Sequence, residues 1–249
     1  MTDARSTLQL TYDEVAWLSQ VLETGTPAVL QGRDADAEAG RMSLQARANY
    51  AADEHAPADV PEALRALGSV VCAPTVAVLV EEERAGVLER LWLLGRDSFQ
   101  VEAAPWSDDA LELTLVDLAQ RLTDQVGLEA EAGEPLQVRT TGRRLVDLVL
   151  TSDRGGDAAG SLSARGRVSD ASAAFAEAYR TRTRSVQVRI HRLEGEAIVG
   201  GELAWIESTS HGLWTCPRFT EAPAADETVV LERWSSVRIR EELLSYLQN

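Results

Sequence analysis

Side chains that could act as nucleophiles, bases or metal ligands are few in this sequence. It contains two cysteines, Cys72 and Cys216, and three histidines, His55, His191 and His211. A catalytic thiolate needs a base within hydrogen-bond reach, and only His211 and Cys216 are close along the chain. If the chain between them is a straight strand, their Cα atoms lie about 16 Å apart. We therefore expect no local Cys–His pair, and we expect both thiols to be free and structural.

Other signatures of chemistry are missing or have simpler interpretations. The sequence has no lysine, which excludes a phosphate-binding loop of the GxxxxGK[ST] type, and it has no HExxH, CxxC or GxSxG motif. Successive carboxylates at Glu81–Glu83 face opposite sides of a strand. Asp108 and Asp109 suit the first turn of a helix. The sequence therefore predicts no enzymatic activity, no cofactor and no metal.

Composition limits the partners. Of the 249 residues 45% are apolar, which is enough for a packed core, and the net charge is −16. A surface this acidic repels phosphate groups, so we expect neither nucleic acid nor a membrane as partner. The N-terminal residues MTDARSTLQL lack the pattern of a secretory signal, and no apolar run approaches 18 residues. We therefore expect a cytoplasmic protein.

Periodicity predicts helices first and strands afterwards in the N-terminal half. Thr11 and Glu14 have the spacing of a capping box, and they open a helix that ends near Gly25. Further helices are predicted over residues 37–53 and 60–71, then strands over 76–83, 87–95 and 98–104. After Ser107, leucines at 111, 115, 118 and 122 have the spacing of an amphipathic helix.

The second half repeats this plan. Short helices over 141–150 and from 169 to 178 flank a loop at 151–166, which is predicted to be mobile. Strands are predicted over 185–193, 197–207, 212–217 and 228–234, before a last helix capped by Ser235 or Ser236. The repeat predicts a single α+β domain over residues 1–249, with pseudo-repeat halves of about 1–127 and 128–249. Their antiparallel sheets could join edge to edge.

The motifs of these elements, in their order, resemble the EspG family of cytosolic chaperones in type VII (ESX) secretion of actinobacteria. The matching segments are LQLTYDEVAWLSQVLETGTPAVL, ANYAADEHAPADVPEALRALGSVV, Arg189-Ile190, Gly201 to Trp205, Gly212-Leu213-Trp214 and VVLERWSSVRIREELLSYL. The family implies two pseudo-symmetric halves around a central antiparallel sheet flanked by helical bundles. It also implies a strand first, and an apolar strand at PAVL.

The resemblance implies a function as well. Proteins of this family bind the apolar tip of a PE–PPE heterodimer before export, keep it soluble and direct it to its secretion system. This chain is short for the family and differs over 151–166, so a WXG-like helical substrate is equally compatible. An apolar groove that binds the tip of a helical partner is therefore expected, with Leu145, Val149, Val168, Phe175 and Tyr179 as candidate contacts.

Two alternatives remain open at this point. An adaptor or immunity protein could block a basic partner through the acidic surface, and its binding would depend strongly on salt. A small hydrolase or transferase could use His191 or His211, although the sequence shows no convergent polar groups around either.

Overall fold

The computed structural model describes residues 7–48, 61–126, 135–153, 170–216 and 224–248. The strands are β1 (Thr7–Thr11), β2 (Val76–Arg84), β3 (Val87–Arg96), β4 (Phe99–Pro105), β5 (Ala110–Leu115), β6 (Gln137–Thr141), β7 (Arg184–Glu194), β8 (Ala197–Ser208), β9 (Gly212–Cys216) and β10 (Thr228–Trp234). The helices are α1 (Tyr12–Val21), α2 (Ala37–Ala48), α3 (Glu62–Cys72), α4 (Leu118–Thr123), α5 (Gly142–Asp153), α7 (Asp170–Arg180) and α8 (Ser236–Gln248).

The strands follow one another in a ten-stranded sheet in the order β1-β5-β4-β3-β2-β7-β8-β9-β10-β6. Counted from either edge of the sheet toward its middle, the strands of each half follow in the same order. Strands β1 to β5 of the first half thus correspond to β6 to β10 of the second. Helices repeat as well: α1 follows β1 as α5 follows β6, and α3 precedes β2 as α7 precedes β7. This confirms the predicted α+β class with pseudo-symmetric halves.

The correspondence extends to single residues through the strand registers. Leu8 of β1 lies opposite Leu113 of β5, and Val138 of β6 lies opposite Leu231 of β10. The position of the boundary between the halves at 127/128 stays a prediction, because residues 127–134 lie outside the described residues.

Two compact units make up the chain. Unit 1 contains Met1–Leu79, Arg90–Arg121 and Ile190–Val199, and unit 2 contains Val80–Glu89, Leu122–Arg189 and Gly200–Asn249. The polypeptide therefore passes from one unit to the other five times, and neither unit is a continuous stretch of sequence. Each unit has its own apolar core.

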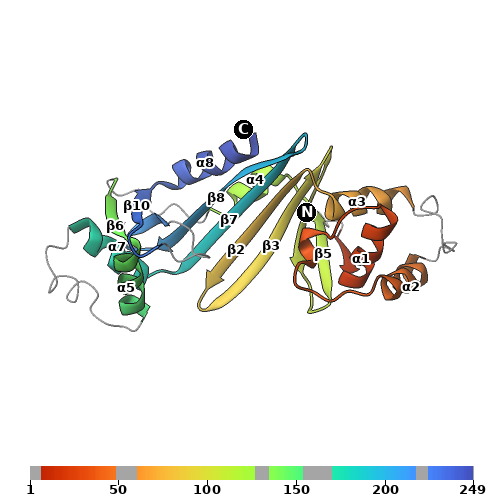
Figure 1. Cartoon of the computed structure of the whole chain (residues 1–249), viewed down its shortest axis with the longest axis horizontal. Coiled ribbons are helices and arrows are strands. Elements are labelled where there is room, and N and C mark those ends of the chain that lie inside the picture. Colours follow the sequence, from red (N-terminus) through yellow and green to blue (C-terminus); the bar gives the residue numbers. More distant parts are fainter. Residues whose placement is uncertain (1–6, 49–60, 127–134, 154–169, 217–223, 249) are drawn as a thin grey trace, which may run out of the picture. The chain divides into compact units, whose positions relative to one another are not determined.

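The core of unit 1 forms where α1, α2 and α3 gather beside the sheet (Figure 1). The predicted capping box is confirmed: the Glu14 amide donates to Thr11 Oγ1 at 3.1 Å, and the Thr11 amide donates to Glu14 Oε2 at 2.9 Å. Helix α1 then buries one face against sheet residues that include Leu10, Leu94 and Leu111. Strand β1 is thus joined directly to the helix that covers it.

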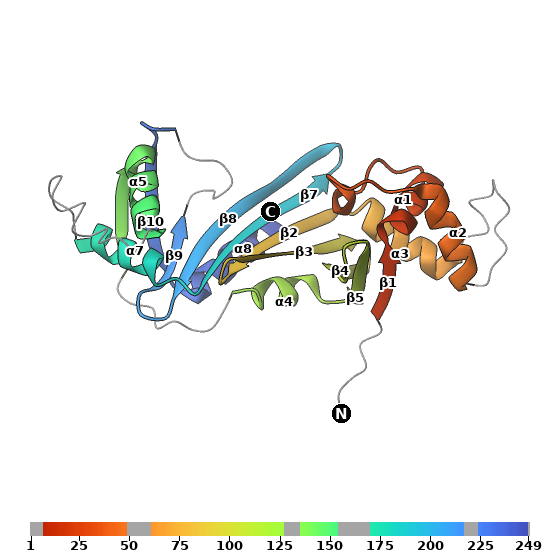
Figure 2. The same ribbon diagram turned by 90° about the horizontal axis from the view of Figure 1, so that it is seen from below.

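Unit 2 has its core between α5, α7 and the strands β6, β9 and β10 (Figure 2). Trp205 and Trp214 are both fully buried in this unit, so the aromatics of the GELAWIE and GLWTC strands pack in the interior. Position 201 requires glycine for steric reasons, because a Cβ there would lie 2.6 Å from the ring of Tyr246 on α8. The last helix therefore packs directly on β8.

Two predictions about elements were wrong. Residues 110–115 form strand β5, and only Leu118–Thr123 are helical, where one helix was predicted over both. Leu111 and Leu115 are four residues apart, and this even spacing places them on one face of a strand as well as of a helix. The segment PAVL was expected to be a strand, but Ala28–Leu30 is a 3-10 helix.

Other boundaries shift by a few residues. Helix α2 is described to Ala48, and the rest of the helix predicted over 37–53 lies outside the described residues. Helix α3 begins at Glu62 with Pro61 as its N-cap, two residues after the predicted start at 60. Most of the loop predicted at 151–166 lies outside the described residues, whereas 151–153 belong to α5.

Candidate functional site

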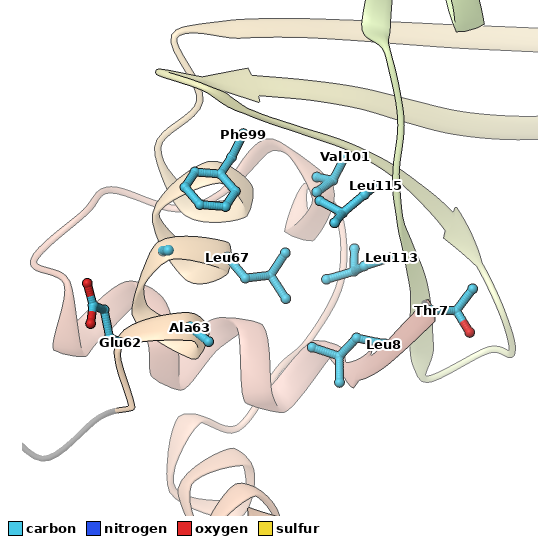
Figure 3. A pocket seen from close by; sticks show the side chains of 10 residues that line it. Thr7, Leu8, Glu62, Ala63, Leu67, Phe99, Val101, Leu113 and Leu115 are labelled. Carbon is cyan, nitrogen blue, oxygen red and sulfur yellow. The ribbon is translucent and has the colours of Figure 1, made fainter. Parts of the chain in front are cut away.

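An open apolar pocket lies beside helix α3 in unit 1. Its volume is about 550 Å³. Helix α3 forms one wall and the sheet forms the other, with Leu67 pointing from the helix toward Leu113 and Val101 (Figure 3). The lining residues are Thr7, Leu8, Glu62, Ala63, Ala66, Leu67, Phe99, Val101, Leu113 and Leu115. This volume falls in the range of pockets that bind small ligands.

A second pocket of about 500 Å³ shares Leu8, Ala63 and Leu67 with the first and extends it toward α2. Its other lining residues are Leu10, Leu44, Arg47, Pro61 and Leu64. Since the two pockets have three residues in common, they form one apolar groove along α3 and β1. We call this the α3 groove and define it by the lining residues of both pockets.

The groove exists because the apolar face of the sheet extends beyond the helices that cover it. Directly opposite residues in an antiparallel sheet share a face, so Leu8, Leu113, Val101 and Leu115 all belong to the same apolar face. Leu10 and Leu111 are buried, whereas Leu8 is 40%, Phe99 46% and Leu115 60% exposed. The core of unit 1 thus continues into a strip that is open to solvent.

The equivalent place in unit 2 is closed. Val101 lies opposite Leu115, and the corresponding pair there is Trp214 opposite Arg233. The Trp214 indole is fully buried and meets the Phe175 ring of α7 edge-on, with 5.4 Å between the centroids. In unit 1 the same strand position carries Val101, which is 1% exposed, so smaller side chains pack where two aromatic rings pack in unit 2.

Two of the lining side chains carry charge. Glu62 is exposed in the first turn of α3 and lines the larger pocket. Arg47 lines the smaller pocket, and its guanidinium already binds the buried carboxylate of Glu14 at 2.7 Å. For Glu62, in contrast, the structure describes no ion pair. Its carboxylate therefore gives the groove a local negative charge.

The predicted contact residues lie in unit 2. Phe175, Tyr179 and Leu145 are 1%, 7% and 9% exposed and belong to the apolar core. Val149 is half-buried and packs against this core, and Val168 lies outside the described residues. The structure brings four of the five together, and their role in partner binding stays a prediction.

The candidate catalytic residues do not form a site within the described part of the chain. His191 is exposed, and His211 precedes β9, whereas Cys216 ends that strand. Burial raises the pKa of the Cys72 thiol to about 12, so this thiol is protonated and unreactive near neutral pH. Over the described ranges, no three His, Cys, Asp or Glu side chains are grouped as metal ligands would be.

The sequence matches no known family description and no curated protein. Its fold, however, is similar to a solved structure, that of the Mycobacterium tuberculosis type VII secretion system chaperone EspG5 in complex with the PE25–PPE41 dimer. The alignment covers 97% of this chain and 96% of the matched chain, with a TM-score of 0.63 and 15% sequence identity. At this identity the likeness shows the fold.

In the described ranges, no helix has the length and apolar character that a membrane span requires.

Proposed function

We propose that this protein is a non-enzymatic chaperone that binds an apolar surface of a helical secreted protein. The observation that carries the proposal is the α3 groove, in which Leu8, Phe99 and Leu115 remain exposed at the edge of a well-packed core. Large apolar side chains gathered at a groove are typical of a surface that a partner covers. The fold shared with a chaperone that was solved with its PE25–PPE41 partner supports the same conclusion.

The partner that fits best is a helical secreted protein of the PE–PPE or WXG-like kind. Binding would cover its apolar tip in the cytoplasm, keep it soluble and direct it to a type VII secretion system. The net charge of −16 adds solubility to such a complex.

The five residues predicted as contacts form a second part of the proposal. Val149 is half-buried on α5 and can touch a partner directly. Leu145, Phe175 and Tyr179 are buried, so they would act by holding α5 and α7 in place. Val168 is the fifth predicted contact and lies outside the described residues.

Co-purification with the helical proteins encoded beside this gene tests the proposed function. We expect one of them to form a stable complex with the wild-type chain, detected by size-exclusion chromatography and titration calorimetry. Binding should persist in 0.5 M salt, because apolar contacts are not screened. Failure of every candidate to bind at tens of micromolar would contradict the proposal. Binding that disappears in salt would instead favour an adaptor that acts through its acidic surface.

A further inference from the structure

We propose that the α3 groove binds an amphipathic helix of the secreted partner, which inserts an aromatic side chain beside Leu67 and Leu115 and places a basic side chain near Glu62. This inference rests on the proposed function and adds the chemistry of the bound segment. Three observations support it: the way unit 2 fills the same place, the state of the sheet edge, and the charge of the lining.

In unit 2 a helix of the chain itself covers the equivalent face of the sheet with aromatic contacts. There a helix, α7, lies over β6 and β9, and its Phe175 ring packs against Trp214. Both rings are buried, at 1% and 0% exposure. In unit 1 the equivalent strand residue is Val101, and α3 presents Ala63, Ala66 and Leu67 to the groove. Helix α3 is the counterpart of α7, but these side chains are smaller than Phe175 and Trp214 and leave the pocket beside Leu115 unfilled. An aromatic or large aliphatic side chain of a partner would fill it.

The adjacent sheet edge argues that the bound segment is a helix and not an added strand. The Tyr12 amide donates to the carbonyl of Asp109, so in β1 the odd-numbered residues direct their backbone groups away from β5. The Gln9 carbonyl already accepts from Arg47 at 2.9 Å, and the Thr11 amide donates to Glu14. A strand added at this edge would have to break both contacts.

The negative charge of Glu62 predicts where a basic residue of the bound helix lies. Glu62 lines the larger pocket at the N-terminal end of α3, and Figure 3 shows its side chain beside the first turn of the helix, away from Leu113. A lysine or arginine about one turn from the aromatic anchor would lie close to this carboxylate. The net charge of −16 favours the approach of a basic segment in the same way.

Two variants introduce into the groove the residues that stand at the equivalent positions of unit 2. Val101→Trp introduces the aromatic residue found at the equivalent position, Trp214, and Leu115→Arg introduces the residue equivalent to Arg233. Leu115 is 60% exposed, so this second variant keeps the test valid if the larger ring at Val101 disturbs folding. Ile198→Arg, at a side chain that is 74% exposed elsewhere in unit 1, is the matched control.

The probe is a blocked 20-residue synthetic peptide with Phe and Leu at i, i+3 and i+4 and lysines on its polar face. A second peptide carries glutamates in place of the lysines. By fluorescence anisotropy we expect the lysine peptide to bind the wild type and Ile198→Arg equally, and to bind Val101→Trp and Leu115→Arg at least about tenfold more weakly. Equal binding to wild type and Leu115→Arg would overturn the inference, as would no binding to the wild type.

The charge contribution is tested with Glu62→Gln, and Glu23→Gln removes one exposed charge elsewhere in unit 1 as its control. We expect the first to weaken binding of the lysine peptide about two- to threefold relative to the second. The glutamate peptide should bind wild type more weakly than the lysine peptide does. Equal effects of the two substitutions would contradict the assignment of Glu62.

The same variants separate this inference from the proposed function. If a secreted helical partner binds the wild type and Leu115→Arg equally well, the groove is not its site, and the chaperone function stands. If no secreted partner binds the wild type, the chaperone function fails, whatever the peptide result.

Discussion

Glu14 is the residue that connects most of unit 1 near the groove. Its side chain is fully buried, and it accepts from the Thr11 amide, from Ser43 Oγ at 2.7 Å and from Arg47 at 2.7 Å. One carboxylate thus caps α1, attaches α2 and satisfies the edge of β1. A buried charge is tolerated only when it is surrounded by donors in this way.

Removing one of these donors should be costly. We expect Arg47→Met to lower the free energy of unfolding by about 2 kcal/mol, because the Glu14 carboxylate stays buried with fewer donors. Arg41→Met, on the same helix and paired with the exposed Glu38, should have a much smaller effect. Urea unfolding followed by circular dichroism measures both. Equal losses would show that the contact of Arg47 with Glu14 contributes no more than the exposed pair of Arg41 and Glu38.

The Cys72 thiol offers a second prediction at this scale. Burial raises its pKa from 9.0 to about 12, so the folded protein holds this proton at pH values where the unfolded chain has released it. Stability should therefore fall as pH rises from about 9 toward 12. In a Cys216→Ser background, Ellman's reagent at pH 8 should react slowly with the native protein and rapidly in guanidinium. Immediate reaction of the native thiol would contradict the assignment.

At the scale of elements, the sequence predicted what depends on local patterns. The capping box at Thr11, the hairpin strands of both halves and the last helix all follow from residue types at short spacing. Strand β5 was missed because Leu111, Leu115, Leu118 and Leu122 fit a helix, although Leu113 shows the alternation of a strand. Its partner β4 is adjacent in sequence, but its other partner, β1, is distant along the chain, and this second pairing cannot be read from local spacing.

The α3 groove was missed for a related reason. An apolar stripe that packs inside and one that faces a partner have the same spacing, so the sequence pointed to Phe175 and Tyr179, which are buried. What distinguishes the groove is a comparison across the repeat, with Val101 where the second half has Trp214. That comparison needs the strand registers, which the sequence does not reveal.

Packing between helices leads to a prediction about Gly40. A Cβ at this position would lie 2.0 Å from the backbone oxygen of Asp13, so α2 touches α1 without any side chain between them. We expect Gly40→Ala to lower the free energy of unfolding by about 3 kcal/mol, despite the better helix propensity of alanine.

Gly25→Ala is the control for this substitution, because no atom lies within 4 Å of the added carbon. Its stability should stay within about 1 kcal/mol of the wild type, or rise slightly. Thermal unfolding compares the two variants. A neutral Gly40→Ala would mean that α1 and α2 can separate at little cost.

At the scale of the whole molecule, the exchange of segments between the units governs how the chain can be divided. Unit 1 includes Ile190–Val199, and unit 2 includes Val80–Glu89. We expect the fragment 1–127, expressed alone, to be less helical per residue and far more sensitive to trypsin than the full chain. The full chain, treated in parallel, is the reference. A fragment as protected as the full chain would show that unit 1 folds without its third segment.

The five passages between the units also bear on synthesis. On the ribosome, residues 190–199 of unit 1 emerge only after about three-quarters of the polypeptide has been made, whereas the described residues of its apolar core all lie between Leu10 and Leu113. Helices α1, α2 and α3 can therefore bury their apolar faces against β1, β3, β4 and β5 before that segment has been made. Folding during translation can thus begin with the helical core of unit 1, and the segment at 190–199 joins this unit late.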